Sequence, residues 1–325
     1  MANINSIMKI LIIKPSSLGD VIHALRIVAQ VKKSYPQASI DWVIRNGLEG
    51  ILHASGIVDH LLIFNRGKGF FDYLGLIAEI RKKEYDYVLD LQGLLRSAII
   101  AGFSKSKNIF GVADGREGSV LFYKTVGESN RSKQIHAIDR LVPFLEILKS
   151  KKHGSSLSLD FKDSALSEAT QEKLNQSSDY LLLFPESRRS EKEWPFFSNL
   201  AEELNTSNQE DIVIAGDRKD GTYEKFKDLR GEIELNELPV LIKNAKMVIS
   251  NDSAPLHIAS SLGKPAISLF GPTDPVKYGY YPACSPLNGS IRAGDGILKR
   301  ISVERVVQEY EKLLGASKVE REMNQ

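Results

Sequence analysis

The chain has 325 residues, of which 42% are hydrophobic and 26% are charged, and its formal net charge is +2. This composition excludes dominant disorder. The chain is long enough for one large or two medium domains. So balanced a charge argues against a general nucleic-acid binder. The one cysteine, Cys284, excludes an internal disulfide framework, and no Cys/His cluster has zinc spacing.

The chain also carries no sign of export. The N-terminus has no signal-peptide pattern, and no stretch approaches the roughly 20 apolar residues that span a bilayer. We therefore expect a cytoplasmic protein that is neither exported nor membrane-spanning, with Met8 as a candidate start. Residues 1–150 carry a net charge of +6 and residues 151–325 one of −4. A basic first half suits an anionic partner, and scattered solvated charge is the alternative.

Short apolar runs alternate with helical patterns through the first half of the chain. Strands separated by helices indicate a parallel sheet with right-handed crossovers. An apolar stripe over 135–148 predicts a helix that closes this half. The pattern predicts strands at 9–13, 41–44, 60–64, 87–91 and 108–112, helices at about 21–34 and 70–83, and an apolar segment at 94–103.

A second α/β half follows a shift in composition toward Ser, Lys and Glu. We place a linker at 151–178 between domains 1–150 and 179–325. For the final helix, packing back on the first domain is one arrangement. The second half is predicted to hold strands at 180–184, 211–216, 247–250 and 265–271, and helices after Pro195, near 223–229, from about Pro255 and at about 303–314.

Ligands of open parallel sheets bind beyond the carboxyl ends of the strands. Polar clusters follow four strands of the second half and are expected to line one edge. They occupy 185–189, 215–218, 251–257 and 271–274.

The NDSAPLH segment at 251–257 offers Asp252 or Ser253 as a helix N-cap, with first-turn N–H groups available to an anion. A plain cap is an equally good interpretation. His257 either reaches the same anion or is structural. In GPTDP at 271–275, glycine and two prolines hold a loop still. Lys192 either neutralises a diphosphate or is a solvated surface lysine.

The KPSSLGDVIHAL segment at 14–25 is a strand-to-helix turn that ends in an acid, Asp20. It lacks both G-x-G-x-x-G and the P-loop pattern, which disfavours a dinucleotide or P-loop site and hence a dehydrogenase. Asp20 is either a helix cap or a carboxylate presented at the sheet edge, ionised at neutral pH. The chain contains no Asp-x-Asp pair, so a metal held by that motif is not suggested.

Taken in order, the motifs resemble lipopolysaccharide heptosyltransferases of glycosyltransferase family 9, and most of all heptosyltransferase I. The resemblance implies a GT-B fold: two Rossmann-like domains with parallel sheets facing across a cleft, acceptor domain first and ADP-sugar domain second. It also implies no metal or other cofactor. The motifs are KPSSLGDVIHAL, DLQGLLRSA at 90–98, REGSVLFY at 116–123, HAIDR at 136–140, KEWP at 192–195, NDSAPLH and GPTDP.

The family's pattern assigns roles to individual residues. It implies that Asp20 is the general base and that Lys192 stabilises the departing ADP. The implied donor-binding residues are Ser187, Lys192, Gly216, Asp220, Asp252, Ser253, Ala254, His257, Gly271, Pro272 and Thr273. The implied acceptor-binding residues are Ser17, Gly19, Arg66, Lys68, Gln92, Arg116 and Arg140.

The implied reaction moves heptose from ADP-heptose to a Kdo residue of Kdo-lipid A, by a monomer at the cytoplasmic face of the inner membrane. Phe70 and Phe71 are expected to pack against the sheet, and contact with the membrane surface is the alternative. Two other functions remain open. One is heptosyltransferase II or another family 9 core transferase, and the other is a non-catalytic ADP-sugar-binding protein.

Overall fold

The computed structural model describes residues 7–65, 67, 69–128, 134–175, 177, 179–218 and 223–323, with side chains to residue 315. It divides into two compact units, Met1–Asp163 (unit 1) and Ser164–Gln325 (unit 2). The division falls inside the segment 151–178 that is predicted as the linker.

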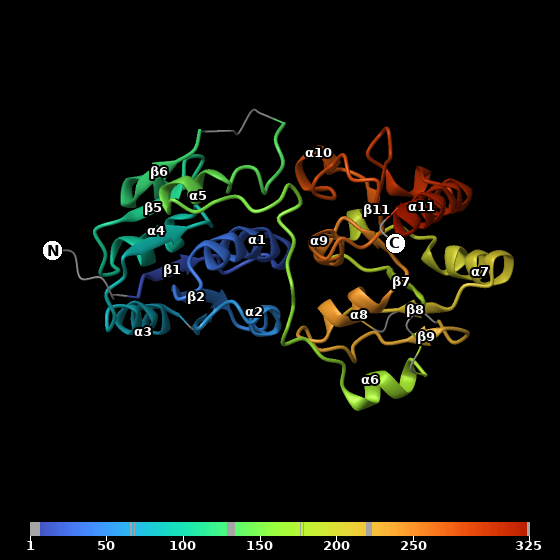
Figure 1. Ribbon diagram of the computed structural model, residues 1–325, viewed down its shortest axis with the longest axis horizontal. Helices are drawn as coiled ribbons and strands as arrows, with labels where there is room; N and C mark the ends of the chain where they lie inside the picture. Colours follow the sequence, from blue (N-terminus) through green and yellow to red (C-terminus); the bar gives the residue numbers. More distant parts are fainter. Residues whose placement is uncertain are drawn as a thin grey trace. The chain divides into compact units, whose positions relative to one another are not determined.

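Unit 1 is built on a parallel sheet of six strands. These are β1 (Lys9–Ile13), β2 (Ser39–Arg45), β3 (His60–Phe64), β4 (Tyr87–Asp90), β5 (Ile109–Val112) and β6 (Lys124–Val126), in the order β3-β2-β1-β4-β5-β6. Its helices are α1 (Leu18–Ser34), α2 (Glu49–Ser55), α3 (Phe70–Ile80), α4 (Leu95–Gly102) and α5 (Pro143–Ile147), with a 3-10 turn η1 (Ser119–Phe122). Helices α3 and α4 cover one face of the sheet, and α1 and α2 cover the other (Figure 1).

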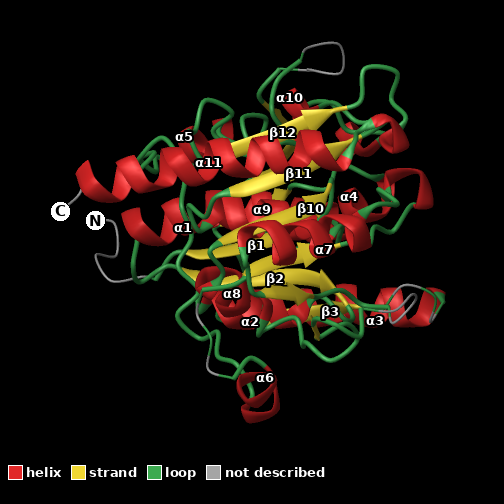
Figure 2. Ribbon diagram, turned by 90° about the vertical axis from the view of Figure 1, so that its right-hand side faces the viewer, coloured by secondary structure: helices red, strands yellow, loops and turns green. Residues whose placement is uncertain are grey.

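Unit 2 repeats this plan. Its strands are β7 (Leu181–Phe184), β8 (Ile212–Ile214), β9 (Lys227–Asp228), β10 (Met247–Asn251), β11 (Ala266–Phe270) and β12 (Asn288–Arg292), in the order β12-β11-β10-β7-β8-β9. Its helices are α6 (Glu168–Lys173), α7 (Phe197–Asn208), α8 (Leu238–Asn244), α9 (Ala254–Ser261), α10 (Pro275–Tyr278) and α11 (Val303–Met323), with 3-10 turns η2 (Ser190–Lys192) and η3 (Leu298–Arg300). Figure 2 looks onto the face of the sheet that α7 and α11 cover.

The strand order confirms the predicted α/β class with two Rossmann-like parallel sheets. In each unit the first strand lies between the second and the fourth. The order in which strands are added to the sheet therefore reverses at the pair formed by the first and fourth strands, which run parallel. Ile13 of β1 lies opposite Asp90 of β4, and Phe184 of β7 lies opposite Ser250 of β10. Ligand sites of open α/β sheets form beyond the carboxyl ends of such a strand pair.

Helix α1 starts earlier than predicted, because Ser17 is its N-cap and Asp20 its third residue. The Asp20 carboxylate accepts the N–H of Ser17, which is one half of a capping box. The helix is buried from residue 21 to residue 31. It includes Arg26, which is fully buried and whose guanidinium donates to the carbonyls of Ser156 and Leu157.

Two predicted helices are wrong. Residues 223–229 contain strand β9 in place of a helix, because Lys227 and Asp228 pair with β8 and sheet pairing overrides the helical pattern. Over 135–148 only α5 is an α-helix, and residues 137–142 form turns. Pro143 lacks an N–H and fits best at the first position of a helix, so α5 begins there. The apolar stripe is buried nevertheless.

The expected packing of Phe70 and Phe71 is also wrong. Their side chains are 68% and 86% exposed. Helix α3 contacts the sheet through Leu76, Ile77 and Ile80, which lie further along the helix.

Helix α11 continues to residue 323, beyond the predicted end at 314, and its described side chains pack within unit 2. Packing of this helix on the first domain stays a prediction. In the described part of the chain, no helix is both long and apolar enough to cross a membrane.

Gly111→Ala is expected to destabilise unit 1, because a Cβ on Gly111 would lie 2.5 Å from the ring of Tyr123. Such overpacking costs typically about 1–3 kcal/mol. Gly75→Ala is the matched control, since nothing lies within 4 Å of its added Cβ and it sits in α3. There the change should stabilise by up to about 1 kcal/mol through helix propensity. Urea unfolding midpoints measure both effects, and equal midpoints for the two variants would contradict the packing.

Candidate active site

Asn251, the last residue of β10, holds the loop after β7 against the end of β10. Its side-chain oxygen accepts the N–H of Trp194 at 3.0 Å, and its amide nitrogen donates to the carbonyl of Pro185 at 2.8 Å. Asn251 is fully buried, so both bonds are shielded from water. Asn251 was not among the predicted site residues, although its place at the end of a strand in NDSAPLH was a signal.

The Asp252 carboxylate joins two further loops. Lys192 Nζ lies 2.6 Å from Asp252 Oδ2, and the hydroxyl of Thr273 donates to the same oxygen at 2.6 Å. The side chains of Asp252 and Lys192 are only 7% and 17% exposed. A carboxylate so far from water needs such donors. Three predicted donor-site residues are therefore in direct contact, although 60 and 21 residues of sequence separate them from Asp252.

The first turn of α9 lies directly after this carboxylate. Ser253 is the N-cap, but its hydroxyl donates to the carbonyl of Asn251 at 3.3 Å and makes no capping bond to the helix. Ser253, Ala254 and Pro255 are half-buried. N–H groups at a helix start that lack a side-chain cap, together with the helix dipole, suit an anion such as phosphate. Here the interpretation as a plain side-chain cap is wrong.

The GPT loop after β11 is held by close packing. A Cβ on Gly271 would lie 2.9 Å from the carbonyl oxygen of Gly296, so the backbone approach requires glycine. Pro272 is exposed, and Thr273 points its hydroxyl to Asp252. His257 lies in α9 and is buried, with 7% of its surface exposed.

The loops after β7 and β8 meet through Glu186. Its carboxylate accepts the N–H groups of Asp217 (2.9 Å) and Arg218 (2.9 Å). A Cβ on Gly216 would lie 2.8 Å from this carboxylate, so Gly216 permits the approach. The guanidinium of Arg218 pairs with Glu193, which also accepts the N–H of Ser187 at 3.0 Å. The predicted Asp220 lies outside the described residues.

These contacts unite the four polar clusters expected from the sequence. The segments 185–189, 215–218, 251–257 and 271–274 all follow strands of unit 2, and side-chain bonds link each of them to another. The edge of the sheet beyond β7 and β10 is therefore a connected polar surface beside Lys192 and the open start of α9.

In unit 1 the corresponding edge carries Asp20. The carboxylate is half-buried and accepts hydrogen bonds from the N–H (3.1 Å) and the hydroxyl (2.7 Å) of Ser17. Ser17 and Gly19 form the turn after β1 with it. Asp20 is therefore not the N-cap of α1, as one interpretation had it. It is the third residue of the helix, completes the capping box with Ser17 and retains contact with solvent.

A second carboxylate at this edge, Asp90, was missed as a site residue. It ends β4, is fully buried, and accepts the N–H groups of Gln92 (3.0 Å) and Gly93 (3.1 Å) and the hydroxyl of Ser97 (3.0 Å). Burial raises the pKa of Asp90 to about 6, although these hydrogen bonds and Lys14 oppose the shift. The bonds shape the turn that carries Gln92, whose side-chain oxygen is buried and has no hydrogen-bond partner among the described residues.

Two of the remaining predicted acceptor residues lie at the loop after β5. Arg116 is exposed just before η1, and Arg140 forms an ion pair with Asp114. Arg66 and Lys68 lie outside the described residues. Among the residues that are described, no three His, Cys, Asp or Glu side chains gather as a metal site would require.

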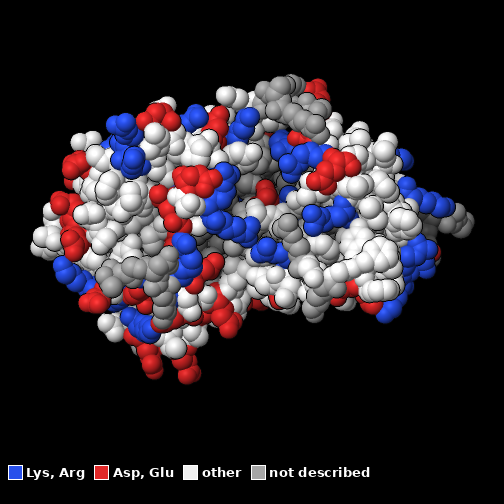
Figure 3. All heavy atoms as spheres, turned by 180° about the vertical axis from the view of Figure 1, so that it is seen from behind, with Lys and Arg blue, Asp and Glu red and all other residues white. Residues whose placement is uncertain are grey.

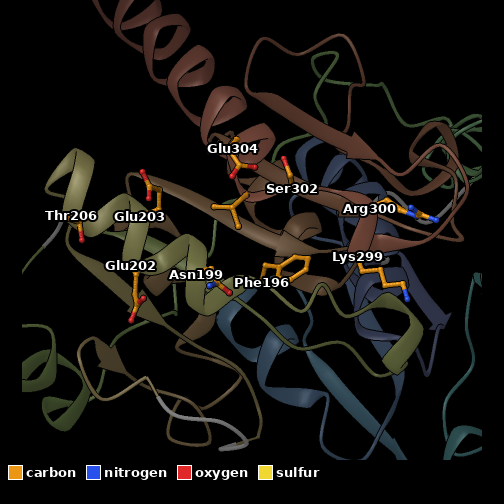
Figure 4. A pocket seen from close by; sticks show the side chains of 10 residues that line it. Phe196, Asn199, Glu202, Glu203, Thr206, Lys299, Arg300, Ser302 and Glu304 are labelled. Atoms are coloured by element: carbon orange, nitrogen blue, oxygen red, sulfur yellow. The ribbon is translucent and has the colours of Figure 1, made fainter.

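A separate hollow of about 680 Å³ lies in unit 2. Figure 4 shows its lining side chains coming from α7 and from the segment that leads into α11. Both charge signs line it, and the predicted site residues do not. The surface in Figure 3 likewise mixes basic, acidic and uncharged side chains on one face.

Asp90→Asn is expected to flatten the pH dependence of stability. The folded pKa of about 6 exceeds the ordinary value of 3.8, so the folded state binds the proton more tightly than the unfolded chain does. Asp90 therefore makes the protein less stable as the pH rises from about 4 to about 6, by about 3 kcal/mol at most. Asparagine keeps the oxygen that accepts from Gln92 and Gly93 but carries no charge.

Urea unfolding of both proteins across this pH range measures the difference. The variant should gain stability relative to the wild type as the pH rises. A difference that stays constant over the range would contradict the raised pKa.

Comparison with known proteins places this geometry in a family. The family described as glycosyltransferase family 9 (heptosyltransferase) matches residues 73–302. The chain is 29% identical to the lipopolysaccharide core heptosyltransferase OpsX of Haemophilus influenzae over 290 residues, which cover 83% of this chain and 81% of that protein. It is 26% identical to lipopolysaccharide heptosyltransferase 1 of Salmonella typhimurium, over 86% of this chain and 95% of that one.

A solved structure shares the fold. The Escherichia coli heptosyltransferase WaaC with ADP superposes with a TM-score of 0.75 at 23% identity, over 94% of this chain and 100% of that chain. The likeness shows the GT-B fold, and the family match covers more than half of the sequence. The chain is a glycosyltransferase and belongs to glycosyltransferase family 9, the heptosyltransferases.

Proposed function

We propose that the protein transfers L-glycero-D-manno-heptose from ADP-heptose to a Kdo residue of Kdo-lipid A, with inversion and without a metal. The observation that carries the proposal is the contact of Lys192 and Thr273 with Asp252 beside the open first turn of α9. Lysine and helix N–H groups are the groups that hold a diphosphate. Relatives bearing the name of lipopolysaccharide heptosyltransferase, and WaaC with ADP, support the donor class.

The donor half lies on unit 2. Lys192 and the N–H groups at Ser253 and Ala254 hold the diphosphate and stabilise the negative charge that develops on the leaving ADP. Asp252 orients Lys192 and the hydroxyl of Thr273, because both donate to it. Ser187, His257, Gly271 and Pro272 complete the sugar-diphosphate site, and Gly216 and Asp220 are the proposed contacts of the adenosine.

The base is Asp20 on unit 1. Its carboxylate removes the proton of the acceptor hydroxyl while that oxygen attacks the anomeric carbon. The bond from this carbon to the β-phosphate oxygen breaks, and ADP departs with the electron pair. The two hydrogen bonds from Ser17 keep the Asp20 carboxylate in place.

The acceptor half is also on unit 1. Guanidinium and ammonium groups suit the carboxylates and phosphates of Kdo-lipid A, and the basic first half of the sequence fits this role. Arg116, exposed beside the turn of Gln92, contributes such a group. Ser17, Gly19, Arg66, Lys68 and Arg140 are the further acceptor contacts. A lipid acceptor places the enzyme, as a monomer, at the cytoplasmic face of the inner membrane.

Mass spectrometry tests the reaction. The protein is incubated in EDTA with ADP-heptose and deacylated Kdo₂-lipid A, and the expected product is heavier by one heptose. Transfer only to an acceptor that already carries heptose would instead assign the role of heptosyltransferase II or a later core transferase. Donor binding without ADP release on any core acceptor would leave a non-catalytic ADP-sugar-binding protein.

Asp20→Asn is expected to lower kcat by about 10²–10⁴-fold, because general base catalysis is lost. Donor affinity should stay unchanged, since the substitution is isosteric and lies on the other unit. Calorimetric titration with ADP-heptose and the rate of ADP release measure the two quantities. If affinity and rate fall together, Asp20 is structural and the proposed base is wrong.

Lys192→Met is expected to weaken ADP binding by roughly 10–100-fold, since a charged hydrogen bond contributes about 1.5–3 kcal/mol. Lys243→Met is the matched control, because Lys243 is an exposed lysine near the end of α8 in the same unit. Calorimetry with ADP gives both affinities. Equal affinities in the two variants would show that Lys192 does not hold the diphosphate.

A further inference from the structure

Unit 1 exposes a group of apolar side chains that its core leaves uncovered. Phe71 and Leu121 are each 86% exposed, and Phe70 is 68% exposed. With three neighbours they make up six of the eleven large apolar residues that are exposed in the described part of the chain. We call this group the apolar rim: Phe70, Phe71, Leu74, Leu95, Val120 and Leu121.

Hydrogen bonds link the elements that carry the rim. The hydroxyl of Tyr73 on α3 donates to the carbonyl of Arg96 on α4 at 2.6 Å. The N–H of Leu95 on α4 donates to the carboxylate of Glu117, just before η1, at 3.3 Å. The first turns of α3 and α4 and the turn η1 are thus held together.

The rim borders the edge of the sheet that carries the proposed acceptor site. Helices α3 and α4 follow β3 and β4, so their first turns lie at the carboxyl ends of the strands. The N–H of Arg116 donates to the carbonyl of Gly93 at 2.8 Å, which fixes the start of η1 beside the turn of Gln92. Asp20 follows β1, the neighbour of β4, at the same edge.

Positive charge accompanies the rim. Arg96, Arg116 and Lys124 are exposed and form no ion pair with a described residue. Two acids also lie on these elements: Glu117 accepts the N–H of Leu95, and Asp72 accepts the side-chain amide of Asn65. Exposed aromatic and leucine side chains with basic neighbours suit the boundary between acyl chains and anionic headgroups.

We propose that the apolar rim inserts into the interfacial layer of an anionic phospholipid bilayer and so brings the acceptor site to its lipid-anchored substrate. This inference rests on the proposed function, which supplies a bilayer-embedded acceptor. Phe71 and Leu121 enter the acyl boundary, and the basic side chains face the headgroup phosphates. Binding to the bilayer would confine the enzyme's search for its lipid-anchored acceptor to the two dimensions of the membrane.

Sedimentation with vesicles tests the binding. The probe is phosphatidylcholine vesicles with on the order of 30 mol % phosphatidylglycerol. Phe71→Ser with Leu121→Ser is expected to weaken binding at least about tenfold, since each exposed apolar side chain contributes to insertion. The matched control is Val276→Ser with Ile297→Ser, because these side chains are 47% and 42% exposed on unit 2. The control should bind as the wild type does.

A kinetic measurement separates this inference from the proposed function. The rim variant should show a KM raised about tenfold for Kdo₂-lipid A in vesicles and an unchanged KM for the deacylated acceptor. The deacylated assay also reports correct folding. Vesicle binding needs no turnover, so loss of all transfer with rim-dependent binding intact would overturn the proposed function alone.

Three results would overturn the proposal that the apolar rim inserts into a bilayer. They are vesicle binding that the rim variant retains, no binding of the wild type to the vesicles, and a loss of self-association in the rim variant by analytical ultracentrifugation. The last result would assign the rim to a second copy of the chain.

Discussion

The Asp252 carboxylate is the interaction on which the donor half depends. It is nearly fully buried, so the fold must supply donors to it, and those donors are Lys192 from the loop after β7 and Thr273 from the loop after β11. The neighbouring carboxylate holds the ammonium group of this lysine at a defined position. Because α9 begins two residues after this carboxylate, the same contact brings the cation beside the open helix start.

The two units share one strand order but carry different side chains at the end of the fourth strand. Each places a buried side chain where the fourth strand of its sheet ends: Asp90 in unit 1 and Asn251 in unit 2. Asp90 bonds backbone N–H groups and shapes the turn of Gln92, whereas Asn251 joins two segments and leaves the next residue, Asp252, for the charged contacts. Burial raises the pKa of Asp90, so a shaping carboxylate carries a cost in stability at neutral pH that the neutral Asn251 avoids.

In helix α3 the apolar sequence pattern and the observed burial of the side chains disagree. The helical period across Leu76, Ile77 and Ile80 supplies the contacts of α3 with the sheet. Phe70 and Phe71, in the first turn, stay exposed. Apolar residues at the start of a helix are ordinarily read as core, and only the position of that turn beyond the strand ends distinguishes Phe70 and Phe71 from Leu76. This exposure is the observation from which membrane contact of the apolar rim is proposed.

The sequence by itself determined the α/β class, the two halves, most strand positions and the four polar clusters of unit 2, because apolar periodicity and turn residues act locally. Only the tertiary structure decided that residues 227–228 form an edge strand, that α5 starts at Pro143, and that Phe70 and Phe71 stay exposed. It also revealed Asn251 and Asp90 as the residues that organise the two edges. These outcomes depend on contacts between segments far apart in the chain, and no local pattern records such contacts.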